Sequence, residues 1–322
     1  MIRWEVLEIL KAIDFLRAFA AVLITNSHFD NLYPNPSLSV GGALGNAIFF
    51  FISGYCLSQK VYSVSLGHWI KTKIIRIYPA LWVCSILAIL AGYYEIKKQY
   101  ILRIFLFPYN SYWFVCAIMI YYVVFYFVAQ LEKKQLQWLM ALNVLAYFML
   151  YFSTRDLNKW CVEAPDYFKY VFYFGVMLAG YYSRVSKIIQ KEIPWGMISM
   201  ASLIGYFVSK IVVNYDNRMM RFQFLVQMAT LSFAMSTVVW AINKEAFFET
   251  FCEGHRRIGT IIRHIGASTL EIYLLNYVVV SYSSAVSFPV NIGIAFICIF
   301  SLGVLLHGII EKMVSYVRKM WR

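Results

Sequence analysis

The chain has 322 residues, of which 61% are hydrophobic and 14% are charged, and its net charge is +13. A soluble domain is about half apolar and about a quarter charged, so this composition excludes an ordinary soluble domain. The Lys and Arg residues fall in the gaps between apolar runs, as topology signals do, and no nucleic-acid recognition motif accompanies them. The sequence therefore indicates the lipid bilayer, and not nucleic acid, as the partner.

Ten apolar segments have about the length that crosses a bilayer, which is roughly 20 residues for a helix. In chain order they are 9–28, 43–60, 74–93, 112–131, 135–152, 167–183, 194–213, 223–242, 266–285 and 290–310. A weaker apolar segment, 98–110, is too short to cross and is expected at the interface. We therefore expect an all-α polytopic integral membrane protein, with one membrane-embedded domain over 1–322 and no separate soluble domain.

The basic residues predict the orientation of these segments. With the N-terminus inside, 20 of the 29 Lys and Arg residues fall on the cytoplasmic side. This is a positive-inside bias, so both termini are predicted to be cytoplasmic. The start of the chain has no small-residue cleavage site, and we expect no cleavable signal peptide.

The first segment, LKAIDFLRAFAAVLITNSHFD, carries ionisable side chains where a membrane makes them costly. On a continuous helix Arg17 and His28 share one face and lie about 16 Å apart along the axis. Asp14 lies one turn before Arg17 and can pair with it. These three are candidate functional residues. The alternatives are an interfacial histidine at a helix end and a structural Asp14–Arg17 pair.

Two further motifs follow in the second and third segments. Ser53 and Gly54 come after an aromatic run, and they belong either to a site or to a small-residue packing face. Lys73, Arg76 and Tyr78 lie at the start of the third segment. Their two cations suit a phosphate group. Alternatively, they are an orientation signal or a contact with lipid headgroups.

Later segments carry weaker signals. Trp113 begins the fourth segment, as a residue of an aromatic belt would. Glu271 is interpreted as an interface residue, and His255 and His264 in the basic stretch before it as solvated. The chain has no metal-ligand spacing, no C-x-x-C pair among its six cysteines, no Walker lysine loop and no G-x-S-x-G elbow. We therefore expect neither a metal site nor a disulfide framework.

In chain order these motifs resemble the acyltransferase family 3 membrane proteins, which are bacterial O-acyltransferases of cell-surface carbohydrates. The similar segments are IDFLRAFAAVLITNSH, IFFFISGYCLS, KTKIIRIYPALWV, WF at Trp113 and STLEIYLLN. Two positions depart from the family pattern. Lys73 stands where the family commonly has Arg, and Asn276 stands where the last segment often ends in His.

The resemblance implies transfer of an acyl group, with acetyl expected, from cytoplasmic acyl-CoA to a hydroxyl of a cell-surface or exported carbohydrate, lipid-linked or free. It implies three catalytic residues, His28, Arg17 and Asp14. The residues that it implies for binding the acyl-CoA co-substrate are Lys73, Arg76, Arg17, Ser53 and Tyr78. No metal is expected, and the expected location is the cytoplasmic membrane of a bacterium.

In the mechanism that fits this resemblance, His28 takes a proton from the sugar hydroxyl that attacks the thioester. Ser53, Asn26 and Asn46 are candidate donors to the developing oxyanion. An acyl-histidine intermediate is the other route. The alternative functions are a transporter or flippase of a glycan or lipid-linked intermediate, and a non-catalytic scaffold. Transporters frequently show repeated halves, which this sequence lacks.

Overall fold

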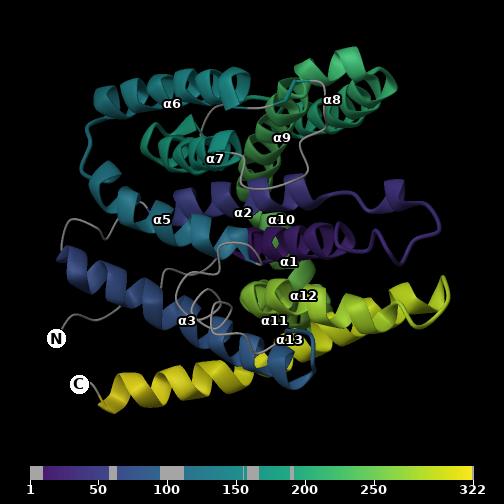
Figure 1. Cartoon of the computed structure of the whole chain (residues 1–322). Coiled ribbons are helices and arrows are strands. Elements are labelled where there is room, and N and C mark those ends of the chain that lie inside the picture. The colour runs from purple at the N-terminus through teal and green to yellow at the C-terminus, as the bar shows by residue number, and fades with distance from the viewer. Residues whose placement is uncertain are drawn as a thin grey trace. The chain divides into compact units, whose positions relative to one another are not determined.

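The computed structural model describes residues 10–57, 64–94, 112–154, 156–157, 167–188 and 192–320, and these contain helices and turns but no strand. The predicted all-α class is confirmed for this part of the chain (Figure 1). The predicted interfacial segment 98–110 lies outside the described residues. The chain forms two compact units, and each is described by itself.

Unit 1 contains residues from 1–45, 78–96 and 240–322. Its helices are α1 (Lys11–Asn26), η1 (Pro36–Leu38), the second half of α3 (Leu66–Leu90), α10 (Glu245–Gly254), α11 (Arg256–Ala267), α12 (Thr269–Ser283) and α13 (Val290–Met320). The candidate base, His28, lies in this unit.

Unit 2 contains residues from 46–77 and 97–239. It holds the first half of α3, most of α2 (Gly42–Cys56), α5 (Trp113–Val128), α6 (Lys133–Thr154), α7 (Tyr167–Val185), α8 (Trp195–Tyr215), η4 (Asn217–Phe222) and most of α9 (Phe224–Asn243). Ser53, Lys73 and Arg76 lie in this unit.

Each of the ten predicted segments overlaps a helix. In the described part of the chain, six helical segments are long and apolar enough to cross a membrane: 36–56, 66–90, 133–154, 195–215, 218–243 and 290–316. α5 is apolar but shorter. Several large apolar side chains of α6, α8 and α13 are exposed, among them Leu142, Ile211 and Ile297. Such surfaces are stable against lipid tails and costly in water.

Helices α2 and α7 of unit 2 cross with their backbones in contact. A Cβ atom on Gly54 would meet the carbonyl oxygen of Met177, and one on Gly180 would meet that of Phe51, both well inside the 3.0 Å that real Cβ atoms respect. Small residues permit this approach, which stabilises helix pairs where lipid gives no hydrophobic driving force. The sequence left two alternatives for the Ser53–Gly54 motif, a site or a small-residue packing face. Gly54 belongs to the packing face.

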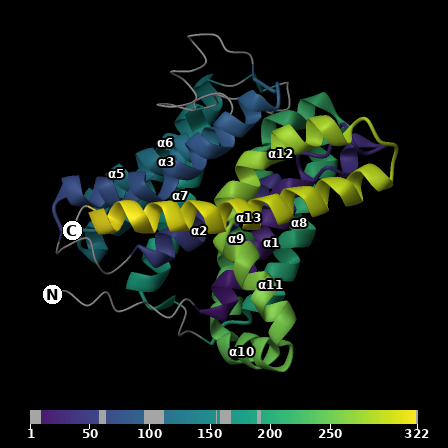
Figure 2. The same ribbon diagram turned by 90° about the horizontal axis from the view of Figure 1, so that it is seen from below.

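Contacts across unit 1 hold α1 against α10, α11 and α12. Helix α10 lies beside α11 and the start of α1 (Figure 2). The carboxylate of Glu245, on α10, accepts hydrogen bonds from the backbone N–H groups of Lys11 and Ala12. It thereby caps the N-terminus of α1, where unpaired N–H groups and the helix dipole favour a negative charge. A Cβ on Gly266 of α11 would lie 2.8 Å from the carbonyl oxygen of Asp14, so α11 packs directly on α1.

Candidate active site

His28 lies in a turn just beyond α1. The helix ends at Asn26, and the His28 N–H donates to the Thr25 carbonyl oxygen at 3.1 Å. The expected continuous helix therefore ends two residues before His28. The imidazole meets α12 edge-on, with ring centroids 4.6 Å from Tyr277 and 6.5 Å from Tyr273.

The loop after α1 is tied to Asn26. The Asn26 amide donates to the carbonyl oxygens of Leu38 at 3.0 Å and Val40 at 2.9 Å, and its Oδ1 accepts from the Tyr33 hydroxyl. Both N–H groups of this amide are thus committed to the loop. Asn26 was expected as a candidate donor to an oxyanion, but its N–H groups already donate to these carbonyl oxygens.

A buried polar contact joins α1 to α12 one turn before His28. The Thr25 hydroxyl donates to Asn276 Oδ1 at 3.1 Å, and both residues are fully buried. The sequence reading missed Thr25, Tyr273 and Tyr277. The available signal was the spacing of Tyr273, Asn276 and Tyr277, because residues three and four apart share one face of a helix.

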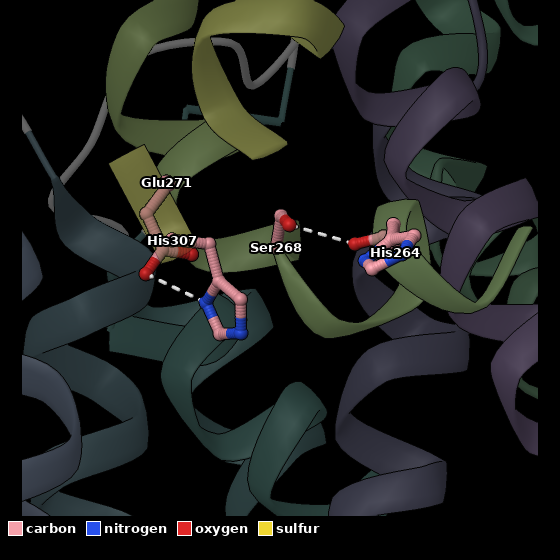
Figure 3. A network of polar contacts seen from close by, with 4 residues as sticks. All are labelled: His264, Ser268, Glu271 and His307. Carbon is pink, nitrogen blue, oxygen red and sulfur yellow. Dashed lines mark hydrogen bonds and ion pairs between the residues drawn. The ribbon is translucent and has the colours of Figure 1, made fainter. Parts of the chain in front are cut away.

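Glu271 at the start of α12 is buried, although the sequence interpretation put it at an interface. Its Oε1 lies 3.1 Å from Nδ1 of His307, on α13 (Figure 3). Nearby, the Ser268 hydroxyl donates to the carbonyl oxygen of His264. His307 was also missed; its signal was a histidine inside a strongly apolar segment, where ionisable residues are rare.

The start of α1 carries charged side chains and meets others from α10 and α11. Asp14 is buried, and Arg17 is the cation that acts on it most strongly, followed by Lys11 and Arg263. A pocket of about 410 Å³ opens here between α1, α10 and α11. It is lined by Lys11, Asp14, Glu249, Cys252, Glu253, Arg256, Gly259, Thr260, Ile262 and Arg263. Asp14 and His28 are fourteen residues apart, so they lie near opposite ends of α1, about 21 Å apart along a helix axis.

The predicted donor-binding residues are divided between the units. Lys73, in unit 2, places its Nζ 4.1 Å from the ring centroid of Trp69 and 4.6 Å from that of Tyr122. These are cation–π contacts, and the Trp69 indole is itself fixed by donating to the Tyr122 carbonyl oxygen at 2.7 Å. Arg76 is exposed in the next turn.

Ser53 and Tyr78 are the other two predicted residues of α2 and α3. Ser53, in unit 2, is partly buried beside the α2–α7 crossing. Tyr78, in unit 1, packs its ring against that of Trp82.

The model of the family Acyl_transf_3, described as an acyltransferase domain, matches residues 10–310. The chain belongs to this acyltransferase family. Comparison with curated proteins and with solved structures found no match. The family match confirms the resemblance that the order of the motifs indicated. Together with the apolar helices, it makes the chain a multi-pass membrane acyltransferase.

We expect the acyltransferase to keep its activity well below the pH at which an ordinary histidine protonates. His28 lies outside the candidate spans, and burial lowers the pKa of its imidazole from 6.5 to about 4, because desolvation disfavours the charged form. A base with this lowered pKa stays neutral until the pH falls through about 4. A profile of kcat/KM against pH checks this; a His28-dependent acidic limb near 6.5 would contradict it.

Proposed function

We propose that this acyltransferase moves an acyl group, with acetyl expected, from acyl-CoA to a hydroxyl of a cell-surface or exported carbohydrate at the bacterial cytoplasmic membrane. The observation that carries the proposal is the setting of His28. A partly buried imidazole, packed against two tyrosines of α12, lies in a chain of the acyltransferase family. Such a group can accept a proton from a hydroxyl at neutral pH.

The chemistry assigned to His28 is general-base catalysis. A ring nitrogen takes the proton of the acceptor hydroxyl while the hydroxyl oxygen forms a bond to the thioester carbon. The carbon–sulfur bond then breaks, and the CoA thiolate leaves with the proton that His28 held. The sum is one ester and one thiol, with no net proton released. The alternative route, through an acyl-His28 intermediate, would give a labelled protein when acceptor is withheld.

Arg17 and Asp14 complete the proposed catalytic set at the charged end of α1. Arg17 is the cation that acts most strongly on the buried Asp14. The pair lies about 16–21 Å along α1 from His28, so it acts by fixing the start of α1 and not at the reacting atoms.

Lys73 and Arg76, in neighbouring turns of α3 in unit 2, are the proposed contacts for the phosphates of acyl-CoA. Arg76 is exposed and carries a planar fork that pairs with phosphate through two parallel bonds. Lys73 supplies a point charge, and the rings of Trp69 and Tyr122 restrain it. The two side chains therefore suit different parts of a charged ligand.

The test is acyl transfer by the purified protein in liposomes, with radiolabelled acetyl-CoA and a panel of glycan acceptors. We expect Arg76→Ala to raise the KM for acetyl-CoA by about tenfold and to change kcat little, because a ground-state phosphate contact is lost. Arg257→Ala removes another exposed guanidinium, on α11, and should leave KM unchanged. Neither binding nor turnover of acetyl-CoA by the wild type would favour the transporter or scaffold alternatives.

A further inference from the structure

Helix α12 carries a buried amide donor that lacks a partner. Asn276 is fully buried, and its Oδ1 accepts from the Thr25 hydroxyl at 3.1 Å. Its Nδ2 has no hydrogen-bond partner among the described residues. An unpaired buried donor costs about 1–3 kcal/mol, so native proteins retain one where a water, a ligand or a reaction supplies the missing acceptor.

This amide and the candidate base both lie where the end of α1 meets α12. Thr25 lies one turn before His28. Asn276 lies next to Tyr277 and one turn after Tyr273, the two tyrosines whose rings meet the imidazole. The unpaired N–H groups therefore lie on the same stretch of α12 as the two tyrosines, and the base lies in the turn that follows α1.

The other amide close to His28 cannot serve as a donor. Asn26 uses both of its N–H groups on the carbonyl oxygens of Leu38 and Val40. Asn276 is neutral and cannot take over the proton-accepting role that a histidine at this position could have. What Asn276 can offer to a ligand beside His28 is therefore a hydrogen bond from its unpaired N–H groups.

We propose that Asn276 is a further catalytic residue, whose Nδ2 donates a hydrogen bond to the carbonyl oxygen of the acyl thioester as it becomes an oxyanion. The inference rests on the proposed function. As the hydroxyl oxygen bonds to the carbonyl carbon, the π electron pair moves onto the carbonyl oxygen, and the amide stabilises that charge. The carbonyl re-forms when the carbon–sulfur bond breaks and the thiolate leaves. Asn276 exchanges no proton, and Thr25 is a positioning residue that fixes its amide.

The deciding variant is Asn276→Asp, which keeps the size of the side chain and the oxygen that accepts from Thr25 but removes the N–H donors. We expect kcat to fall about 10²- to 10³-fold, with the KM for acetyl-CoA nearly unchanged, because the lost bond strengthens only in the transition state. Thr25→Val is the matched control. It removes the hydrogen bond that holds the amide but leaves the donors, so its loss in kcat should be about tenfold or less.

The outcomes separate this inference from the function on which it rests. Wild type that transfers acetyl through His28, with Asn276→Asp retaining kcat within about threefold, overturns the inference and leaves the function standing. A wild type without transfer overturns both. If Asn276→Asp does not fold, Asn276→Ala replaces it. Equal losses of thermal stability in Asn276→Ala and Thr25→Val, with kcat unchanged in both, would also overturn the inference.

Discussion

Replacing His28 with Ala is expected to lower acyl transfer by about 10³-fold or more, because positioned general bases contribute about 10²- to 10⁴-fold. The protein should still fold and insert. The backbone bond from residue 28 to Thr25 does not require a side chain, and in the described part of the chain the aromatic contacts of the His28 ring are with Tyr273 and Tyr277. The measurement is the initial rate of label transfer from acetyl-CoA in proteoliposomes, alongside thermal unfolding of the same preparations.

The control for this variant is His255→Ala. His255 is an exposed histidine between α10 and α11, and its loss should leave the rate at the wild-type level. Transfer by His28→Ala at more than about a tenth of the wild-type rate would remove His28 from the role of base, because a tenfold loss lies below the usual contribution of such a group.

The second large effect is expected on stability, at the crossing of α2 and α7. Gly54→Ala and Gly180→Ala should each destabilise the protein by about 1–3 kcal/mol or more, because the added methyl group meets a backbone carbonyl oxygen that cannot rotate away. Thermal unfolding in detergent measures this. The double variant should lose less than the sum of the single losses, since separating the helices once relieves both clashes.

Gly205→Ala provides the comparison in the same unit. Gly205 lies on α8, and, its own stretch of helix aside, no heavy atom of the described residues lies within 4 Å of the position that its Cβ would take. Alanine there should be neutral or stabilising by up to about 1 kcal/mol, because glycine is the poorer helix former. Wild-type stability in both crossing variants would show that α2 and α7 do not approach so closely.

The positions of the helices could largely be predicted from the sequence, because hydropathy and length are local properties. The number of crossings could not, because α1 is short and charged at its start whereas α13 is long and apolar. Helix α10 falls in the gap between the predicted segments 223–242 and 266–285, and α11 falls in the stretch interpreted only as basic. The isoleucines of α11 lie on one face and its arginines on the other. The mean hydropathy of the stretch is therefore low, although the helix packs on α1.

At the candidate site, the sequence supplied His28 but not the residues around it. An imidazole at the end of an apolar segment is visible without a structure, because its cost in a membrane is a property of that residue alone. Thr25 and Asn276 are separated by 251 positions, and Glu271 and His307 by 36. Such contacts depend on which helix faces meet, and the periodicity of a single helix does not determine its neighbour.

The cap that Glu245 places on α1 has a consequence for biosynthesis. The two ends of that contact are 234 residues apart, and synthesis at about 5–20 residues per second separates them by about 10–50 s. During that interval α1 has neither its carboxylate cap nor its neighbours α11 and α12. Residues 97–239 of unit 2 are complete before α10 emerges from the ribosome. The surroundings of His28 therefore form late in translation, and a nascent chain that stops before α12 carries the imidazole without the helix that packs against it.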